Sequence, residues 1–318
     1  MSIFQKLKEK GFTTVPEGFY GYIDLWRSWY NGDVKAFHSY KVFNGQKLLH
    51  CRRYTLGMGK KVAEDWANLL MNERVAITLE GQREQAFFDQ VCRENNFAVK
   101  INEYQELKAG LGTAAYVARV EGATAQGPTG QATGGRIVLD YVDAGRIYPL
   151  SWQNSRATEC AFTSAVAQGG VNYLYLQIHR LGPDGTYQVE NSLFEDRNGS
   201  LAQVELPSVK GFENVPPVVY TGQREPLFVL DRLAIVNNAG PDLPMGIPAF
   251  ANAIDQLKGV DVAYDSYVNE FVLGKKRVMV QPAATRTLDG EPVFDENDVA
   301  FYVLPEEMKD NPLIKEID

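Results

Sequence analysis

The sequence predicts an α+β fold in which helices come first, a run of strands follows, and one long helix lies near the end. Up to about residue 111, apolar residues recur every three or four positions, which is the spacing of an amphipathic helix. From there to residue 235 they tend to alternate, and turn signals divide them into short runs. A helical pattern returns at Pro248. Such segregation of helices and strands is typical of α+β proteins.

Five helices are expected before the strands. They cover residues 1–10, 17–30, 60–72, 82–95 and 101–111. The helix at 60–72 is the clearest, because its apolar residues form one stripe that is expected to face the core. That stripe consists of Val62, Trp66, Leu69 and Leu70. In the helix at 82–95, the residues Ala86, Phe87 and Val91 are expected to face inward.

Strands dominate the middle of the chain. A weakly alternating strand is expected at 46–54, and six more are expected after Gly112. These six cover residues 115–120, 136–142, 159–166, 171–180, 187–194 and 227–235. The segments 182–185 and 196–199 are typical of hairpin turns. The glycine-rich segment 122–135 is expected to be a flexible loop.

The long helix is expected to begin near Pro248 and to end at Gly274. Proline suits the first helical turn, where its missing N–H costs nothing, and glycine suits the residue that closes a helix. About 26 residues at 1.5 Å each would give a helix of about 39 Å. Its apolar row is interrupted by Asp261 and consists of Phe250, Ile254, Leu257, Tyr264, Val268 and Phe271. Periodicity alone favours a long core helix. Strands are expected after it, at 277–281 and 300–304.

Composition excludes some classes of protein. The chain has 318 residues, of which 45% are apolar, so it can bury a sizeable core. Its net charge of −8 argues against a protein that grips nucleic-acid phosphates over a broad surface. Its three cysteines form no Cys-x-x-Cys pair and are expected to be reduced, small hydrophobes. The absence of a signal peptide and of a long apolar run predicts an intracellular, non-membrane protein.

No motif for catalysis or for a cofactor is found. The glycine-rich segment 130–135 is not followed by Lys-Ser/Thr, so it lacks the phosphate loop of an NTPase. No Gly-x-Ser-x-Gly elbow is present, and the three histidines have no nucleophile at a telling spacing. Asp261 and Asp265 lie one turn apart and could share a metal or a proton, but a solvated face or a subunit contact is the simpler interpretation. We therefore expect no enzyme, no cofactor and no metal.

Four successive pieces near the long helix carry a resemblance to a known family. They are Gly246–Phe250, Ile254–Lys258, Tyr264–Glu270 and Gly274–Arg277. Together they resemble the stem-entering helix of bacteriophage portal proteins, in the branch found in tailed phages of Gram-positive bacteria. Shorter pieces upstream are similar to other parts of that family, at 26–32, 61–73, 148–154, 159–162, 173–179 and 187–191. The similarity spans roughly residues 20 to 318.

The resemblance implies an α+β, portal-like arrangement of four parts. Residues 1–17 would be an N-terminal arm, and residues 18–243 a wing domain of helices and mostly antiparallel strands. Residues 244–274 would be a stem helix, and residues 275–318 the start of a clip region. The family normally continues into a second stem helix and a helical crown, which this sequence lacks.

The resemblance also implies a function and partners. A portal protein forms a ring of about a dozen subunits at one capsid vertex, where each subunit contacts its neighbours through two different faces. Double-stranded DNA is packaged and ejected through the ring. The implied partners are the terminase large subunit, head–tail adaptor proteins, and the major capsid or scaffolding protein. The protein would be assembled in the host cytoplasm and carried in the virion.

Two groups of residues become candidates on this basis. Lys275, Lys276 and Arg277 would form a belt of charge that contacts passing DNA without reading its sequence, although a simple cap on the helix end explains them equally well. The candidates for subunit contacts are Phe250, Ile254, Leu257, Asp261, Tyr264, Asp265, Val268 and Phe271. The alternatives are another virion structural protein of a phage, or an unrelated α+β enzyme or ligand-binding protein.

Overall fold

The computed structural model shows an α+β protein whose contacts divide it into two compact units. It describes residues 2–43, 48–71, 75–122, 124–126, 131–197, 199–273, 277–280, 301–303 and 314–317. Unit 1 contains residues 1–35 and 57–257, and unit 2 contains residues 36–56 and 258–318. The segment 36–56, expected above to belong to the wing region, is thus grouped with the C-terminal residues.

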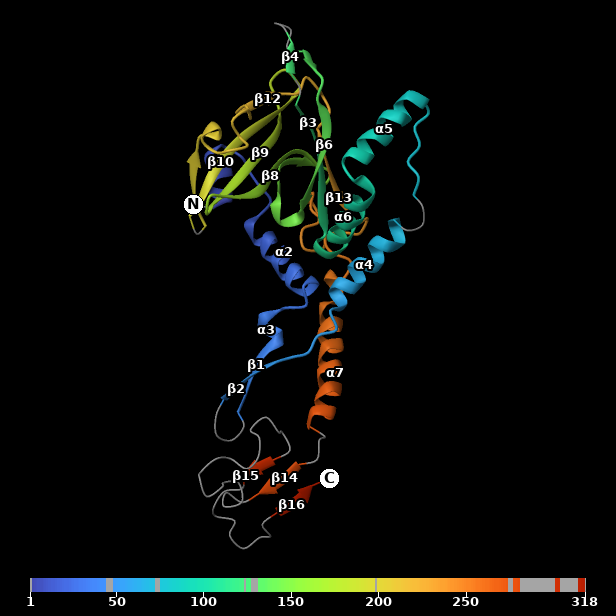
Figure 1. The fold of residues 1–318 in the computed structure, drawn as a ribbon, viewed down its shortest axis with the longest axis vertical. Coiled ribbons are helices and arrows are strands. Elements are labelled where there is room, and N and C mark those ends of the chain that lie inside the picture. The colour runs from blue at the N-terminus through green and yellow to red at the C-terminus, as the bar shows by residue number, and fades with distance from the viewer. Residues whose placement is uncertain are drawn as a thin grey trace. The chain divides into compact units, whose positions relative to one another are not determined.

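The predicted helices of unit 1 are present close to their expected bounds. They are α1 (Ile3–Glu9), α2 (Glu17–Tyr30), α4 (Met58–Met71), α5 (Gln82–Glu94) and α6 (Phe97–Leu111). Ser2 begins α1 with a capping box, in which its hydroxyl accepts from the Gln5 amide and the Gln5 side chain accepts from the Ser2 amide. Gly112 ends α6 with a left-handed φ of 91°, a conformation that suits glycine. In Figure 1, α6 lies along the β13-β3-β6 sheet.

The face of α4 that was expected to be buried is mostly exposed, so that prediction is wrong for three of its four residues, and Val62 is half-buried. Trp66 is 47% exposed, and Leu69 and Leu70 are exposed as well. The helix instead buries its small residues Gly59, Ala63 and Ala67, which recur every four positions. A Cβ added at Gly59 would lie 2.6 Å from the carbonyl oxygen of Trp29. The backbones of α2 and α4 therefore approach closely, and only small side chains fit between them.

The inward face predicted for α5 also needs correction. Ala86 and Phe87 are exposed, whereas Phe88 and Val91 are half-buried. Helix α5 packs against α6 and the strand β6, and its Asn95 cap anchors it there. The side chain of Asn95 donates to the Ile137 carbonyl oxygen at 2.9 Å and accepts from the Leu139 amide at 2.8 Å.

Two larger antiparallel sheets follow the helices in unit 1. The smaller has the order β13-β3-β6, with β3 (Thr113–Glu121), β6 (Arg136–Asp143) and β13 (Phe228–Arg232). The larger has the order β11-β10-β9-β8-β7, with β12 also paired to β10. Its strands are β7 (Ile147–Gln153), β8 (Arg156–Gln168), β9 (Val171–Leu181), β10 (Tyr187–Arg197), β11 (Ser200–Val204) and β12 (Val218–Tyr220). The short helices η1 (Ala144–Arg146) and η2 (Leu206–Ser208) connect them.

All six strands predicted after Gly112 are confirmed, but β7, β11 and β12 were not among them. Strand β7 contains Pro149, and its pairing with β8 is irregular around Ser151. Proline cannot donate to a ladder and is tolerated mainly on an edge strand, which is the place of β7 in its sheet. Strand β12 has three residues, too few to show an alternating pattern.

The core of unit 1 lies between the two sheets and under the first helices. Phe162 of β8 and Phe228 of β13 meet edge to face, with ring centroids 5.5 Å apart. On another side, Phe4 of α1, Tyr20 of α2 and Tyr148 of β7 form one aromatic cluster. The hydroxyl of Tyr20 donates to the Ile147 carbonyl oxygen at 2.7 Å, which ties α2 to the edge of the larger sheet.

The turns between these strands largely follow the sequence. At 182–185 the Gly185 amide donates to the Gly182 carbonyl oxygen at 3.0 Å, which confirms that turn. At 196–199 the Gly199 amide donates to the Asp196 side chain at 2.6 Å, and residue 198 lies outside the described residues. The expected loop at 122–135 contains two short strands, β4 (Thr124–Gln126) and β5 (Gln131–Thr133), which pair with each other. Residues 123 and 127–130 of that segment lie outside the description.

The last helix begins later than predicted. It follows a short 3₁₀ helix, η3 (Ala251–Ala253), and α7 covers Ile254–Leu273. The preceding segment is held in a non-helical form against α6 and β3, because the Gly246 amide donates to the Thr113 hydroxyl and the Ala249 amide to the Ala109 carbonyl oxygen. Phe250 is buried there. The helix has 20 residues, and its expected end at Gly274 lies outside the described residues.

Unit 2 contains a helix, a hairpin and a small sheet. Strands β1 (Ser39–Phe43) and β2 (Leu48–Arg52) follow the short helix α3 (Lys35–His38) and pair antiparallel. The residues of α7 from 258 onward belong to this unit. Its small sheet has the order β15-β14-β16, formed by β14 (Arg277–Val280), β15 (Phe301–Val303) and β16 (Ile314–Ile317). Strands β2, β14 and β15 were predicted from the sequence, and β1 and β16 were not.

Candidate subunit interface

A buried carboxylate on α7 organises unit 2. Asp261 is 3% exposed, and three groups donate to it. The Leu56 amide donates at 2.9 Å, the Thr55 hydroxyl at 3.1 Å, and Nε2 of His38 at 3.0 Å. Because hydrogen bonds offset the cost of burying a charged group, these contacts explain how an aspartate can lie inside the unit. They fix the segment 54–56 on one face of the helix.

Asp265 lies one turn further on the same face and extends this arrangement. It accepts from the Tyr54 amide at 2.9 Å, and its Oδ2 lies 3.9 Å from Nε of Arg53. The Arg53 guanidinium also donates to the Phe37 carbonyl oxygen at 2.8 Å and lies over the ring of Phe37, with 4.4 Å to its centroid. We call Asp261 and Asp265, together with the segment 53–56 that they hold, the carboxylate clamp.

The two carboxylates of the clamp have a structural role. Each already accepts from a backbone amide, so the shared metal considered from the sequence is not supported by their contacts. Within the part of the chain that the structure describes, no group of three His, Cys, Asp or Glu side chains could hold a metal ion. The clamp joins residues more than two hundred positions apart, which no local pattern in the sequence could reveal.

A different side of α7 presents apolar side chains to the surface. Tyr267 is 62% exposed and Phe271 is 64% exposed, and their rings lie edge to face with centroids 4.9 Å apart. Val260 is also exposed, and Tyr264 is half-buried. These residues recur at steps of four, three and four, the spacing of a helix that packs against another surface. We call Val260, Tyr264, Tyr267 and Phe271 the α7 stripe.

The residues proposed for subunit contacts fall into three groups. Phe250, Leu257, Asp261 and Asp265 are buried within the chain itself. Ile254, Tyr264 and Val268 are half-buried. Phe271 is exposed, as part of the α7 stripe. Val260 and Tyr267 were not predicted from the sequence. The apolar row on which that prediction was based runs mainly along the half-buried side of the helix.

The residues proposed to meet DNA are not placed by the structure. Lys275 and Lys276 lie outside the described residues. Arg277 is the first residue of β14, but its side chain is not described. A belt of positive charge at this position therefore stays a prediction.

Unit 1 has an apolar surface of its own, formed by α4, α5 and the segment between them. Its exposed large apolar residues are Trp66, Leu69, Leu70, Val75, Ile77, Leu79 and Phe87. Gln85 fixes the segment to α5, because its side chain accepts from the Leu79 amide at 2.7 Å. A shallow depression of about 410 Å³ lies between residues 78–80 and α5. We call this set of residues the α4–α5 surface.

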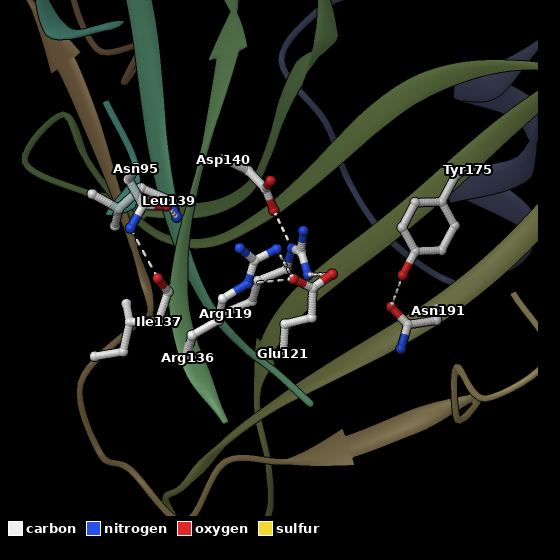
Figure 2. A network of polar contacts seen from close by, with 9 residues as sticks. All are labelled: Asn95, Arg119, Glu121, Arg136, Ile137, Leu139, Asp140, Tyr175 and Asn191. Atoms are coloured by element: carbon white, nitrogen blue, oxygen red, sulfur yellow. Dashed lines mark hydrogen bonds and ion pairs between the residues drawn. The ribbon is translucent and has the colours of Figure 1, made fainter. Parts of the chain in front are cut away.

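A network of charged residues lies on β3 and β6. Figure 2 shows Arg119 beside Asp140 and Arg136 beside Glu121. The Arg119 Nε–H donates to Asp140 at 2.7 Å, and the Arg136 Nε–H donates to Glu121 at 2.9 Å. Two cations and two carboxylates thus balance each other across the two strands. The network fits a role in pairing β3 with β6 better than a role in binding a charged ligand.

His179 is a buried titratable group with a strongly shifted pKa, but its surroundings do not suit catalysis. It is buried, and its ring lies 5.4 Å from that of Phe162 and 5.6 Å from that of Phe228, centroid to centroid. Neither ring nitrogen has a hydrogen-bond partner in the described structure. Burial lowers the pKa of His179 to about 4. The neighbouring thiol of Cys160 has a pKa raised by burial, so it is not an activated nucleophile.

The fold and these surfaces define an α+β protein with polar clusters satisfied from within and apolar surfaces left exposed. Among the described helices, none is long and apolar enough to cross a membrane. Comparison with models of protein families finds no match for the chain. Comparison with curated proteins finds no match either.

Proposed function

We propose that the chain is the subunit of a portal ring, a structural protein at one capsid vertex through which double-stranded DNA is packaged and ejected. The sequence resemblance to bacteriophage portal proteins supports this proposal along most of the chain. The observation that carries it is the α4–α5 surface. On α4, residues with the pattern of a protein core are exposed in a single copy, while small residues make the helix's internal contacts.

An exposed surface of this kind favours association with other copies. The exposed fractions of its seven large apolar side chains correspond to on the order of 700 Å² in total, spread over α4, the segment 75–79 and α5. Unit 2 carries a second apolar surface, the α7 stripe. Two different surfaces on one chain suit a ring, in which each subunit presents unlike faces to its two neighbours.

The polar clusters are consistent with a structural role. The carboxylate clamp and the network on β3 and β6 satisfy their own charges, and neither pairs a nucleophile with a base. The proposed ring converts no substrate, and the terminase large subunit that docks on it would supply ATP hydrolysis. Head–tail adaptor proteins and the major capsid or scaffolding protein would be its other partners. The proposed location is the virion, after assembly in the host cytoplasm.

The proposal is tested by the state of association of the purified chain. Negative-stain electron microscopy, with light scattering to measure mass, should show rings with an axial hole at micromolar concentration. Trp66→Asp should abolish the rings without changing the circular dichroism spectrum, because a charge would be buried in the α4–α5 surface. Tyr220→Asp, which changes an exposed aromatic residue on β12, is the matched control and should leave the rings intact. A chain that stays monomeric at every concentration would contradict the proposal.

A further inference from the structure

The β1–β2 hairpin of unit 2 is unusual because apolar side chains near its tip are exposed on both faces. Phe43 pairs with Leu48 across the strands, and these residues are 65% and 61% exposed. Val42 pairs with Leu49 on the opposite face, and both are also exposed. Among the described residues the two strands pair only with each other. An isolated two-stranded hairpin is at best marginally stable in water, so these features point to a binding partner.

The base of this hairpin is held firmly. The Arg53 amide donates to the His38 carbonyl oxygen at 2.7 Å. The Arg53 guanidinium lies over the rings of Phe37 and Tyr40. The carboxylate clamp then fixes the following segment on α7. The hairpin is therefore an arm whose base is held by these contacts, while its outer described residues Val42, Phe43, Leu48 and Leu49 are uncovered.

The α7 stripe lies on a different side of the helix from the clamp. At 100° per residue, Tyr267 and Phe271 lie about 120° around the helix from Asp261 and Asp265. Both aromatic side chains remain more than half exposed, so the hairpin of the same chain does not cover them. The clamp therefore holds the hairpin where it does not cover the α7 stripe of the same chain.

The hairpin and the stripe match in size and in charge. From their exposed fractions, the hairpin face with Phe43 and Leu48 presents on the order of 300 Å² of apolar side chain and the stripe on the order of 400 Å², up to about half of the ~800 Å² per partner of a standard interface. Residues 39–54 contain four Lys or Arg and no Asp or Glu, and Lys41 lies on the same face of the hairpin as Phe43. On α7, the exposed Glu270 is next to Phe271. Opposite charges therefore flank the two apolar surfaces.

The areas also indicate which partner is expected. A contact of this size is too small to hold an unrelated protein by itself. It is sufficient when the same two molecules are joined elsewhere, since the second contact is then intramolecular. A second copy of this chain meets that condition through the α4–α5 surface.

We infer that the β1–β2 hairpin of one copy docks on the α7 stripe of a second copy, with Phe43 and Leu48 against Tyr267 and Phe271. This inference rests on the proposed association of copies and adds which surfaces meet in unit 2. The contact is head to tail: each copy gives its hairpin to one neighbour and receives a hairpin from the other.

Cross-linking between differently tagged chains tests this contact. One chain carries Phe43→Cys and the other Phe271→Cys, both in a background with Cys51→Ser and Cys92→Ser that leaves the buried Cys160. The two chains are co-expressed, purified as assembled protein and treated with a short bismaleimide. A cross-linked species with both tags is expected, at least tenfold more abundant than with Phe43→Cys and Val262→Cys. Val262 is the matched control, because it is exposed but lies about 180° from Phe271 around α7.

The possible outcomes separate this inference from the proposed function. Rings without the cross-link, or with equal cross-linking at Val262, overturn the docking of the hairpin and leave the ring itself in place. Cross-linking of Phe43→Cys chains with each other in preference to the mixed pair also overturns it, since that result means a contact between hairpins. A wild-type chain that stays monomeric overturns both. Circular dichroism spectra equal to that of the wild type show that the exposed substitutions preserve the fold.

Discussion

Asp261 shows how one residue can hold distant parts of a unit together. Its carboxylate is buried and accepts from Leu56, Thr55 and His38, so its removal would leave three donors without their acceptor. Breaking a buried, hydrogen-bonded charged group in this way is costly, because the remaining polar groups have already lost their water. The importance of Asp261 therefore comes from its surroundings, since an exposed aspartate on the same helix would contribute little.

We predict that Asp261→Ala destabilises unit 2 by about 3 kcal/mol. The effect should be local to the clamp, so hydrogen exchange at the Leu56 amide should accelerate strongly in the variant. Ser266→Ala, at an exposed position of the same helix, is the control and should change stability by less than about 0.5 kcal/mol. Unchanged protection of the Leu56 amide would show that the clamp does not hold this segment.

His179 predicts a dependence of stability on pH. Burial between two phenylalanine rings lowers its pKa from 6.5 to about 4, so between these values the unfolded chain binds a proton that the folded chain does not. Stability from this residue is therefore complete above pH 6.5 and is lost as the pH falls toward 4. The loss should reach up to about 3 kcal/mol.

Urea unfolding at pH 7 and at pH 4.5 measures this dependence. His179→Leu should remove most of the difference in unfolding free energy between the two pH values that is due to this residue. His50→Gln, which changes an exposed histidine on β2, should keep it. If His179→Leu retains the full difference, the pH dependence comes from other groups, such as carboxylates.

At the scale of one element, α4 shows that an apolar stripe in the sequence does not tell whether the core of the same chain covers it. The helix packs through Gly59, Ala63 and Ala67, whereas Trp66 faces outward. We predict that Trp66→Ala lowers the free energy of unfolding of the dissociated chain by less than about 1 kcal/mol. This is smaller than the ~3–5 kcal/mol expected if the side chain lay in the core, as its position in the sequence had indicated.

Gly59→Ala, in contrast, should lower the free energy of unfolding more than Trp66→Ala does. Its new Cβ would meet the backbone of Trp29, so α2 and α4 would have to move apart, at a cost of about 1–3 kcal/mol. Denaturant unfolding of both variants below the concentration of association measures the two effects. Gly18→Ala in α2, where an added Cβ meets nothing within 4 Å, is the matched control and should not destabilise the fold. A larger loss for Trp66→Ala than for Gly59→Ala would mean that α4 packs through its large residues.

At the scale of the whole molecule, the proposed ring separates assembly from the passage of DNA. The surfaces inferred for association lie on α4, α5, α7 and the hairpin, whereas the proposed DNA contacts are Lys275, Lys276 and Arg277. Changing these three residues to glutamine should cost only about 1 kcal/mol per chain, the loss of favourable charge at a helix end. In a ring, however, it removes three charges from every subunit at one level of the channel.

We therefore predict that rings with this triple change assemble normally but package or retain DNA poorly. Electron microscopy of the rings and the amount of DNA in assembled heads measure the two properties. A control triple change to glutamine at Lys8, Arg93 and Lys210 removes the same charge from exposed positions of unit 1. Normal packaging by the Lys275–Lys276–Arg277 variant would show that the cluster only caps the helix.

The sequence by itself determined most of the elements and the fold class. Helix α2 begins at Glu17 and ends at Tyr30 as predicted, and Gly112 ends α6, because periodicity and end residues act within a few positions along the chain. The strands β3, β6, β8, β9, β10 and β13 were predicted for the same reason. Elements were missed where that local signal is weak, as in β12 with three residues or β7 with its proline and irregular pairing.

The tertiary structure alone decided which faces are covered and which polar groups meet. The apolar stripe on α4 has the pattern of a buried face. However, α2 approaches α4 so closely at Gly59 that only small residues fit on the inner side of α4. Asp261 and Asp265 look like an interruption of an apolar row, yet they hold a segment more than two hundred residues away in the chain. The physical reason is the same in both cases. Burial and hydrogen bonding depend on neighbours that only the folded chain brings together, and the local pattern does not contain them.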